Sequence, residues 1–278
     1  MDIVKTFNQI RNSPHLKSES VGLVPTMGAL HQGHLALIRT ARLENDVVVA
    51  TIFVNPSQFD DPDDLVSYPR DQERDLALLE QEGVDIVYLP SEDEIYPEGF
   101  DTWVDPGAWA NKLEGVVRPG HFRGVSTVVT KLFNQIQPNR AYFGQKDGQQ
   151  VAVIKHLVLD LNIPVEIRVI GTVREPDGLA LSSRNQQLTP QERASATVIY
   201  KSLLGALQVF RAGEMVAEKL RDSVLDILLL ELKQEQIEYI NIVDPDTFED
   251  RQNLTGTSLI LVSVRFGKVR LIDNLTLS

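Results

Sequence analysis

Apolar and polar positions along the first two thirds of the chain predict strands separated by helices. The apolar, β-branched runs that predict strands lie at 21–24, 47–54, 85–89, 140–143 and 165–170. Apolar residues at helical spacing predict helices near 35–39, 70–82, 125–135 and 147–161. Near-continuous apolar runs are typical of strands buried on both faces of a parallel sheet. The alternation therefore predicts βαβ units in a doubly wound parallel sheet.

The pattern changes at Arg174–Gly178, a cluster of turn-forming residues that we interpret as a domain boundary. Beyond it, two helices are expected near 190–210 and 216–233, and three strands at 237–243, 258–264 and 268–272. Gly267 between the last two strands predicts a hairpin. We expect an α/β fold, with a doubly wound parallel sheet over residues 1–175 and a smaller α+β domain over residues 176–278.

Three features interrupt this pattern. Residues 1–20 predict a short amphipathic helix and a loop. Residues 90–120 are rich in Pro, Gly and Trp without a clear period, which predicts an irregular excursion. Pro25 is expected to end the first strand, because proline cannot donate to a sheet ladder.

The stretch from Val21 to Arg39 carries the strongest chemical signal. Gly28 and Gly33 allow the backbone to approach a bound group closely. His31 and His34, three residues apart at the expected helix start, should place their rings on one face. A helix start favours phosphate, and imidazoles can donate hydrogen bonds to its oxygens. The alternative is a surface turn whose histidines have no role, but the strand–turn–helix context favours a phosphate site.

Other polar residues directly follow predicted strands, where ligands of doubly wound sheets bind. Asn55 and Gln58 follow the second strand, and Gln58 suits a small polar acid or hydroxyl. Lys146 can reach phosphates, and Asp147 can cap its helix or bind ribose hydroxyls. The alternatives are an ordinary loop glutamine and a solvated helix cap with a surface lysine.

Ser182, Ser183 and Arg184 form a compact set of hydrogen-bond donors near the domain boundary. Two hydroxyls and a guanidinium suit a departing pyrophosphate. A polar loop that caps a helix is the alternative, as Thr189–Glu192 illustrates a few residues later.

Several motifs resemble, in the same order, those of one enzyme family. Residues 31–34 match the His-x-Gly-His pattern of class I nucleotidyltransferases and aminoacyl-tRNA synthetases, and the longer block at 25–34, Pro-Thr-Met-Gly-Ala-Leu-His-Gln-Gly-His, resembles that of pantothenate synthetases (pantoate–β-alanine ligases). Further segments that resemble this family lie at 53–59, 68–70, 118–125, 144–150, 181–185 and 270–274. The resemblance thus covers nearly the whole chain.

The resemblance implies a Rossmann-like domain that binds nucleotide and pantoate, a small C-terminal lid domain, and a homodimer. It implies ATP-dependent condensation of pantoate with β-alanine through a pantoyl-adenylate, with release of AMP and pyrophosphate. The catalytic residues it implies are His31, His34, Lys146 and Arg184, with His34 as proton donor. It places ATP on Met27, Gly28, Ala29, Leu30, His31, Gln32, Gly33, His34, Gly144, Gln145, Lys146, Asp147, Val173, Leu181, Ser182, Ser183 and Arg184. It places pantoate and β-alanine on Gln58, Gln150 and Asn55.

Two residues depart from the family pattern. Gln145 stands where an acidic residue usually follows Gly144, and Gly148 stands where an aromatic residue usually follows Asp147. Neither replaces a residue to which we assign chemistry, and both concern helix packing beside the expected site.

Composition narrows the expected partners. The formal charge of −12 argues against nucleic acid, because binders of nucleic acid usually carry basic surfaces. ATP would normally bring Mg²⁺ on its phosphates, and we expect no metal held by the protein alone. The absence of Cys excludes disulfides and a thiol nucleophile. Residues 1–20 lack the apolar core of a signal peptide, and the apolar runs are too short to span a bilayer. We therefore expect a cytoplasmic enzyme acting on small molecules.

Two rival functions share part of this evidence. Another nucleotidyltransferase, one that leaves the nucleotide on its product, would share His31 and His34 but would not explain Gln58 and Gln150. A non-catalytic nucleotide-binding module would not require every expected phosphate-binding residue to be intact. Release of AMP only in the presence of both co-substrates separates the three.

Overall fold

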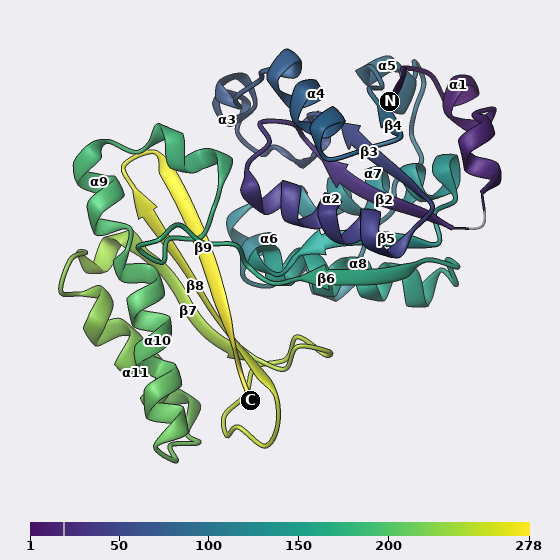
Figure 1. The fold of residues 1–278 in the computed structure, drawn as a ribbon. Helices are drawn as coiled ribbons and strands as arrows, with labels where there is room; N and C mark the ends of the chain where they lie inside the picture. The colour runs from purple at the N-terminus through teal and green to yellow at the C-terminus, as the bar shows by residue number, and fades with distance from the viewer. Residues whose placement is uncertain (19) are drawn as a thin grey trace. The chain divides into compact units, whose positions relative to one another are not determined.

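The computed structural model describes residues 1–18 and 20–278, which form two compact units (Figure 1). The first unit comprises Met1–Gly144 and Val153–Ile170, and the second comprises Gln145–Ala152 and Gly171–Ser278. Residue 19, within the loop expected near the N-terminus, lies outside the described residues. Each unit is built around its own sheet.

The first unit contains a six-stranded parallel sheet, which confirms the expected fold class. Its spatial order is β1-β4-β3-β2-β5-β6. The strands are β1 (Asp2–Val4), β2 (Val21–Thr26), β3 (Val47–Ile52), β4 (Ile86–Tyr88), β5 (Arg140–Gly144) and β6 (Glu166–Ile170). The chain builds outward from β2 on one side and then continues with β5 on the other. The carboxyl ends of β2 and β5 thus flank a topological switch point, where such sheets bind ligands.

Helices flank this sheet on both faces (Figure 1). The α-helices are α1 (Phe7–Arg11), α2 (Gln32–Glu44), α3 (Pro62–Ser67), α4 (Gln72–Gln81), α5 (Glu92–Ile95), α6 (Glu114–Val117), α7 (His121–Ile136) and α8 (Gly148–Asp160). The 3-10 turns of this unit lie at Pro14–Lys17, Pro56–Gln58 and Gly107–Asn111, and the turn at Gln145–Asp147 belongs to the second unit. Leu35, Ile38 and Ala41 of α2 pack with Val48 of β3 and Leu79 of α4 in a buried core. This core holds the strand ends in place behind the expected site.

Two strand expectations near the N-terminus are wrong. Residues 2–4 form β1, an edge strand that pairs with β4 and is too short and exposed to produce an apolar run. The first strand does not stop before Pro25, because β2 continues to Thr26 beside β3. The backbone carbonyl of Val21 accepts a hydrogen bond from the N–H of Asn139 on the β5 side. The backbone groups of alternate residues, up to Pro25, therefore point toward β5. The ladder to β5 ends at Leu23, and Pro25 therefore needs no donor there.

Helix boundaries also differ from the expected ones. Helix α7 begins at His121 rather than near Val125, after Gly120 in a left-handed conformation with φ of 83°. The helix expected over 190–210 is two helices, α9 (Pro190–Ser195) and α10 (Val198–Arg211). Helix α11 (Ala217–Leu228) ends before the expected Lys233.

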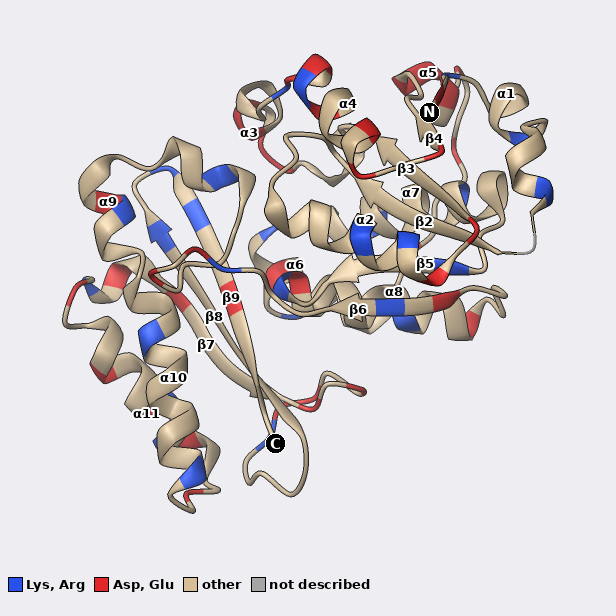
Figure 2. Cartoon of the chain, in the orientation of Figure 1, with Lys and Arg blue, Asp and Glu red and all other residues tan. Residues whose placement is uncertain are grey.

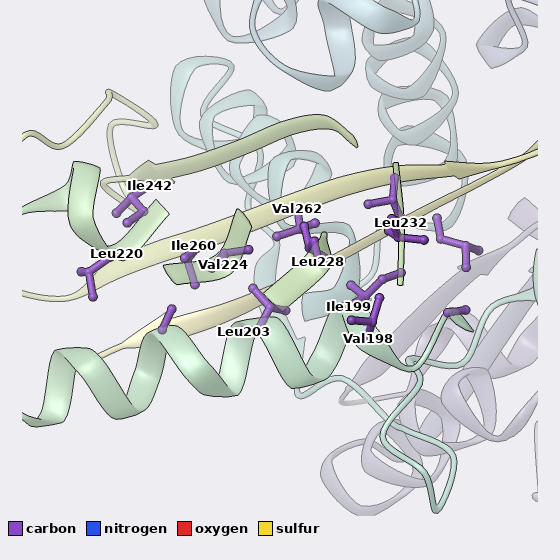
Figure 3. Close-up of a cluster of buried hydrophobic side chains, with 14 of the residues drawn as sticks. Val198, Ile199, Leu203, Leu220, Val224, Leu228, Leu232, Ile242, Ile260 and Val262 are labelled. Carbon is purple, nitrogen blue, oxygen red and sulfur yellow. The ribbon is translucent and has the colours of Figure 1, made fainter. Parts of the chain in front are cut away.

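The second unit packs α10 and α11 against a three-stranded antiparallel sheet of β7 (Ile237–Val243), β8 (Ser258–Phe266) and β9 (Val269–Leu277). Its remaining 3-10 turns lie at Ser183–Gln187 and Gln234–Gln236. Figure 3 shows Leu203, Leu220 and Val224 of the helices facing Ile260 and Val262 of β8 in the buried core. The expected hairpin is confirmed, because Phe266 pairs with Val269 across a turn in which Gly267 has φ of 54°.

Candidate active site

A strained turn connects β2 to α2. Gly28 has φ of 82° and Ala29 has φ of 50°, so both lie in the left-handed region. A Cβ at position 28 would also lie 2.9 Å from Oδ2 of Asp75. The hydroxyl of Thr26 donates to the carbonyl of Thr51 and accepts from the N–H of Gly28 at 3.2 Å. Glycine is therefore required at position 28 for both backbone conformation and space.

Asp75 of α4 holds this turn. Its carboxylate oxygens accept from the backbone N–H groups of Ala29 and Leu30, both at 2.8 Å, and the residue is only 1% exposed. Two consecutive donors on one buried carboxylate explain how the strained conformation is retained. We did not identify Asp75 from the sequence, although a signal exists. Asp75 and Leu79, four residues apart, are the buried residues of α4, so an acid occupies its buried face.

His31 and His34 form the start of α2. Nδ1 of His31 accepts from the N–H of Gly33 at 3.1 Å, and Nδ1 of His34 accepts from the N–H of His31 at 3.3 Å. The ring centroids lie 4.1 Å apart, as the spacing of the two residues predicts. A backbone N–H can only donate, so each Nδ1 is an acceptor and the neutral ring carries its proton on Nε2. An N–H at Nε2 is the kind of donor that a phosphate oxygen requires.

Several acidic residues of the first unit lie at helix starts. Asp63 and Asp64 lie in the first turn of α3, Glu73 in that of α4, and Glu92 in that of α5, and Figure 2 shows red segments at all three helices. Acids at these positions stabilise the helix dipole. These acids thus stabilise their own helices, and the first turn of α2 carries no acidic residue that would repel an anion.

The loop after β3 meets the turn after β2. These strands are parallel neighbours, with Thr26 opposite Ile52, so their carboxyl ends share one edge of the sheet. Asn55 is 1% exposed and Gln58 is 9% exposed. Nδ2 of Asn55 donates to Oε1 of Gln58 at 3.0 Å, and Nε2 of Gln58 donates to the sulfur of Met27 at 3.2 Å. The structure therefore joins the expected ATP-binding turn to the expected pantoate-binding loop.

The loop that carries Lys146 belongs to the second unit and is held by Asn274 of β9. Nδ2 of Asn274 donates to the backbone carbonyls of Gln145 and Lys146, at 2.8 and 2.9 Å. Its Oδ1 accepts from Nε2 of Gln145 at 3.1 Å. The Nζ of Lys146 lies 3.3 Å from Oδ1 of Asp147. Asn274 thus fixes the backbone of this loop and leaves the Lys146 ammonium beside its neighbour's carboxylate.

Both departures from the family pattern lie in this clamp. An amide at position 145 can donate to Oδ1 of Asn274, whereas a carboxylate cannot. A Cβ at position 148 would lie 3.0 Å from Leu259 and 3.2 Å from Nδ2 of Asn274. Gly148 therefore permits the close packing on which the two carbonyl hydrogen bonds depend.

A buried ion pair adjoins the clamp. The carboxylate of Asp273 lies 2.5 and 3.0 Å from the guanidinium of Arg174, which stacks 3.7 Å from the ring centre of Tyr200. Burial raises the pKa of Asp273, although Arg174 opposes the shift. The pair anchors the strand end that carries Asn274.

The second unit also contains the segment around Ser182. The N–H of Leu181 donates to the carbonyl of Val173 at 3.0 Å, which brings these two expected ATP contacts together. The hydroxyl of Ser182 accepts from the N–H of Arg184 at 3.3 Å and caps the turn at Ser183–Gln187. The capping role that we considered as an alternative is therefore present, and Ser183 is 8% exposed.

The expected site residues fall into two groups. The first unit contains Met27, Gly28, Ala29, Leu30, His31, Gln32, Gly33, His34, Asn55, Gln58 and Gly144. The second unit contains Gln145, Lys146, Asp147, Gln150, Val173, Leu181, Ser182, Ser183 and Arg184. In the first unit, the hydrogen bond from Gln58 to Met27 joins two of the expected loops. In the second unit, Leu181 binds Val173, and Asn274 binds the loop that carries Lys146.

Comparison with known proteins identifies the family. The family model described as pantoate-beta-alanine ligase matches residues 2–276. The chain belongs to the pantoate–β-alanine ligase family. It is 52% identical to the pantothenate synthetase of Roseiflexus castenholzii over 274 residues, covering 99% of this chain and 98% of that protein. It is 48% identical to the pantothenate synthetase of Aquifex aeolicus over 271 residues, covering 98% and 96% of the two chains.

Solved structures of this ligase family agree with the fold. Pantothenate synthetase from Thermus thermophilus is 46% identical, with a TM-score of 0.93 and coverage of 99% of both chains. Pantoate-beta-alanine ligase from Francisella tularensis, solved in complex with beta-gamma ATP and beta-alanine, is 39% identical, with a TM-score of 0.78. That comparison covers 99% of this chain and 97% of the other.

Metal-binding clusters and membrane-spanning helices are both absent from the described part of the chain. Residues 1–18 and 20–278 contain no group of three or more His, Cys, Asp or Glu that could hold a metal ion. Among the helices of these residues, none has the length and apolar character needed to cross a membrane.

Replacing Asp75 by Asn tests the clamp on the β2–α2 turn. One amide oxygen can still accept, but the amide nitrogen would face the second N–H, leaving a buried donor unpaired. We expect Asp75→Asn to lower the free energy of unfolding by about 1–3 kcal/mol. Asp71→Asn is the matched control, because Asp71 caps the same helix and Asn caps nearly as well. Equal losses in urea unfolding of the two variants would contradict the clamp.

Replacing Asn274 by Asp tests the clamp on the Lys146 loop. The new carboxylate would face two carbonyl oxygens and lie next to Asp273, so its folded-state pKa should rise above the unfolded value of about 3.9. The folded state then binds more protons, and Asn274→Asp should lose stability relative to wild type as pH rises above about 4. Asn253→Asp serves as the control, because it introduces the same carboxylate at an exposed position. Unfolding curves from pH 4 to 7 with a constant difference would overturn the prediction.

Proposed function

We propose that this chain joins pantoate to β-alanine at the expense of ATP, through a pantoyl-adenylate, with release of AMP and pyrophosphate. The observation that carries the proposal is the pair of imidazoles at the start of α2, each with Nδ1 accepting a backbone N–H. Membership of the ligase family supplies the substrates. The Francisella relative, crystallised with beta-gamma ATP and beta-alanine, supports the same ligands here.

We assign the chemistry as follows. His34 donates from Nε2 to the phosphate, with His31 beside it, and Lys146 and Arg184 neutralise the polyphosphate. ATP lies along Met27–His34, Gly144–Asp147, Val173 and Leu181–Arg184, and Mg²⁺ is bound through its phosphates. Pantoate lies on Gln58 and Gln150, with Asn55 nearby. The site residues of the first unit support the adenylation step, because the turn held by Asp75 presents the two rings together.

The first step requires no general base. A carboxylate is already ionised near neutral pH and is itself the nucleophile that attacks the α-phosphorus. Catalysis then depends on in-line positioning and on donors for the charge that builds up on phosphate. The His, Lys, Arg and Ser side chains of the site can supply such donors. The amino group of β-alanine, after its ammonium has lost a proton to solvent, next attacks the acyl carbon; a C–N bond forms, the bond between the acyl carbon and the AMP oxygen breaks, and AMP departs.

We extend the proposal to organisation in the cell. Residues 1–175 serve as the nucleotide- and pantoate-binding domain, and residues 176–278 serve as a lid. The enzyme works as a cytoplasmic homodimer on small molecules, without nucleic acid. The domain roles and the homodimer are the ones that the resemblance of the motifs to the family implies.

Variants of His34 separate its catalytic role from its capping role. An Asn side chain ends near the position of Nδ1 and can keep the cap, whereas a Gln side chain reaches the position of Nε2. We expect His34→Asn to lower kcat by about 10²–10³, with a smaller loss for His34→Gln and little change in ATP binding. Unfolding measurements serve as the control for the cap. If His34→Asn stayed within a few-fold of wild type, the ring would be structural.

Isotope transfer tests the chemistry itself. In attack at the α-phosphorus, one carboxylate oxygen of pantoate stays with phosphorus when the amine takes the acyl group. Pantoate labelled with heavy oxygen in its carboxylate should therefore deliver one label into AMP and none into pyrophosphate, as mass spectrometry would show. Label in inorganic phosphate with ADP as co-product would refute the adenylate. Absence of AMP with all three substrates would indicate a rival function.

A further inference from the structure

Two segments that have no role so far converge on the loop after β3. One is Tyr96, which follows α5, and the other is the segment Arg118–Gly124 at the start of α7. Nδ1 of His121 donates to the backbone carbonyl of Gln58 at 2.8 Å, and Nη2 of Arg118 donates to the same oxygen at 3.1 Å. All of these residues belong to the first unit. The main chain at Gln58 is therefore held from α7.

Gly124 brings the backbone of α7 against this loop. A Cβ at position 124 would lie 2.4 Å from the carbonyl oxygen of Ser57 and 2.8 Å from the nitrogen of Gln58, both of them backbone atoms. No side chain fits there. The close approach allows the carbonyl of Gly124 to accept from Nδ2 of Asn55 at 3.3 Å.

That carbonyl determines the orientation of two amides. A carbonyl oxygen can only accept, so the nitrogen of Asn55 must be the atom that faces Gly124. The same nitrogen faces Gln58 at 3.0 Å, and the group that it meets there must therefore be the Gln58 oxygen. The nitrogen of Gln58 is left on the opposite side, beside the sulfur of Met27. The sulfur of a thioether is a weak acceptor, so a substrate oxygen would form a stronger hydrogen bond with this nitrogen.

Tyr96 and Ser57 complete the arrangement at the other end of Asn55. Both hydroxyls lie 2.8 Å from Oδ1 of Asn55 and 2.8 Å from one another. Both N–H bonds of the Asn55 amide are then used by protein groups, and the two hydroxyls cover its oxygen. Asn55, which is 1% exposed, is therefore enclosed by protein groups on every side that forms hydrogen bonds.

The ring of Tyr96 is fixed by aromatic packing. Ring centroids of Phe53, Phe100 and Trp103 lie 6.4, 5.1 and 5.9 Å from that of Tyr96. Lys131 lies 5.7 Å from the Tyr96 ring centre. Burial raises the pKa of Tyr96, although Ser57 and Asn55 oppose this, so the hydroxyl keeps its proton. Replacement by Phe would keep the packing and remove only the hydroxyl.

We propose that Asn55 and Tyr96 are positioning residues that orient the Gln58 amide with its nitrogen toward pantoate, where it donates to a substrate oxygen. The inference rests on the proposed function, in which Gln58 binds pantoate. The family resemblance implies that Asn55 binds the substrate directly, whereas in this inference Asn55 acts on the substrate indirectly through Gln58. It also defines the partner of Gln58 as an acceptor, such as a carboxylate oxygen, rather than a donating hydroxyl.

Gln58→Glu tests the orientation directly. Glutamate has nearly the same shape and keeps an acceptor facing Asn55, but it cannot donate to substrate. We expect kcat/KM for pantoate to fall by more than about tenfold, with KM for ATP unchanged. If the amide oxygen faced pantoate instead, Gln58→Glu would keep or improve kcat/KM, and the inference would be wrong.

Tyr96→Phe tests the positioning role. We expect KM for pantoate to rise about fivefold, the effect of one hydrogen bond, with kcat and KM for ATP within twofold of wild type. Asn55→Asp, which cannot donate to Gly124 or Gln58, should cause a larger rise. Tyr88→Phe is the matched control, because the buried Tyr88 hydroxyl has no hydrogen-bond partner in the described part of the chain. Equal effects of Tyr96→Phe and Tyr88→Phe would overturn the proposal.

A double-mutant cycle distinguishes positioning from general structural support. If Tyr96 acts through the Gln58 amide, Tyr96→Phe should have almost no further effect on kcat/KM in the Gln58→Glu background. Additive losses would show that Tyr96 acts elsewhere. Wild-type release of AMP with pantoate, ATP and β-alanine is measured first, because its absence would refute the proposed function, whereas the variants decide the inference.

Discussion

The first unit depends on two hydrogen bonds to one buried carboxylate. Asp75 accepts from Ala29 and Leu30 and thereby holds the left-handed backbone at Gly28 and Ala29. That backbone sets where α2 begins and so where the ring of His31 stands. If either N–H lost its partner in this buried site, the free-energy cost would be about as large as the cost of the strained backbone. The hydrogen bonds to Asp75 therefore favour the strained conformation. The position of the expected catalytic histidines therefore rests on a buried acid whose oxygens bind the backbone of the turn.

The same principle recurs at the other loops of the site. Asn274 holds the carbonyls beside Lys146 in the second unit, and Gly124 holds the amide of Asn55 in the first. In each case a group distant in sequence satisfies the polar atoms of a short loop. Buried polar groups require partners, so each loop adopts the conformation in which all of them are paired. Loops of this kind can present functional side chains with little freedom to move.

Much of the fold was predictable because it is recorded in local patterns. The apolar runs at β2, β3 and β5 identified the parallel sheet, and Gly267 identified the hairpin. The predictions were wrong where pairing with a neighbouring strand overrides the local preference of the sequence for or against a strand. Strand β1 exists only because β4 offers it an edge, and Pro25 remains in β2 only because the β5 ladder has already ended.

The sequence by itself determined the class of fold, the family, and the motifs that carry histidine and lysine to strand ends, because these depend on residue order and periodicity. Only the tertiary structure decided how those motifs are held. Asp75 lies 46 positions from Ala29, and Asn274 lies 128 positions from Lys146. No local spacing records such contacts. They form because a buried donor or acceptor takes whichever partner the packed fold brings within reach.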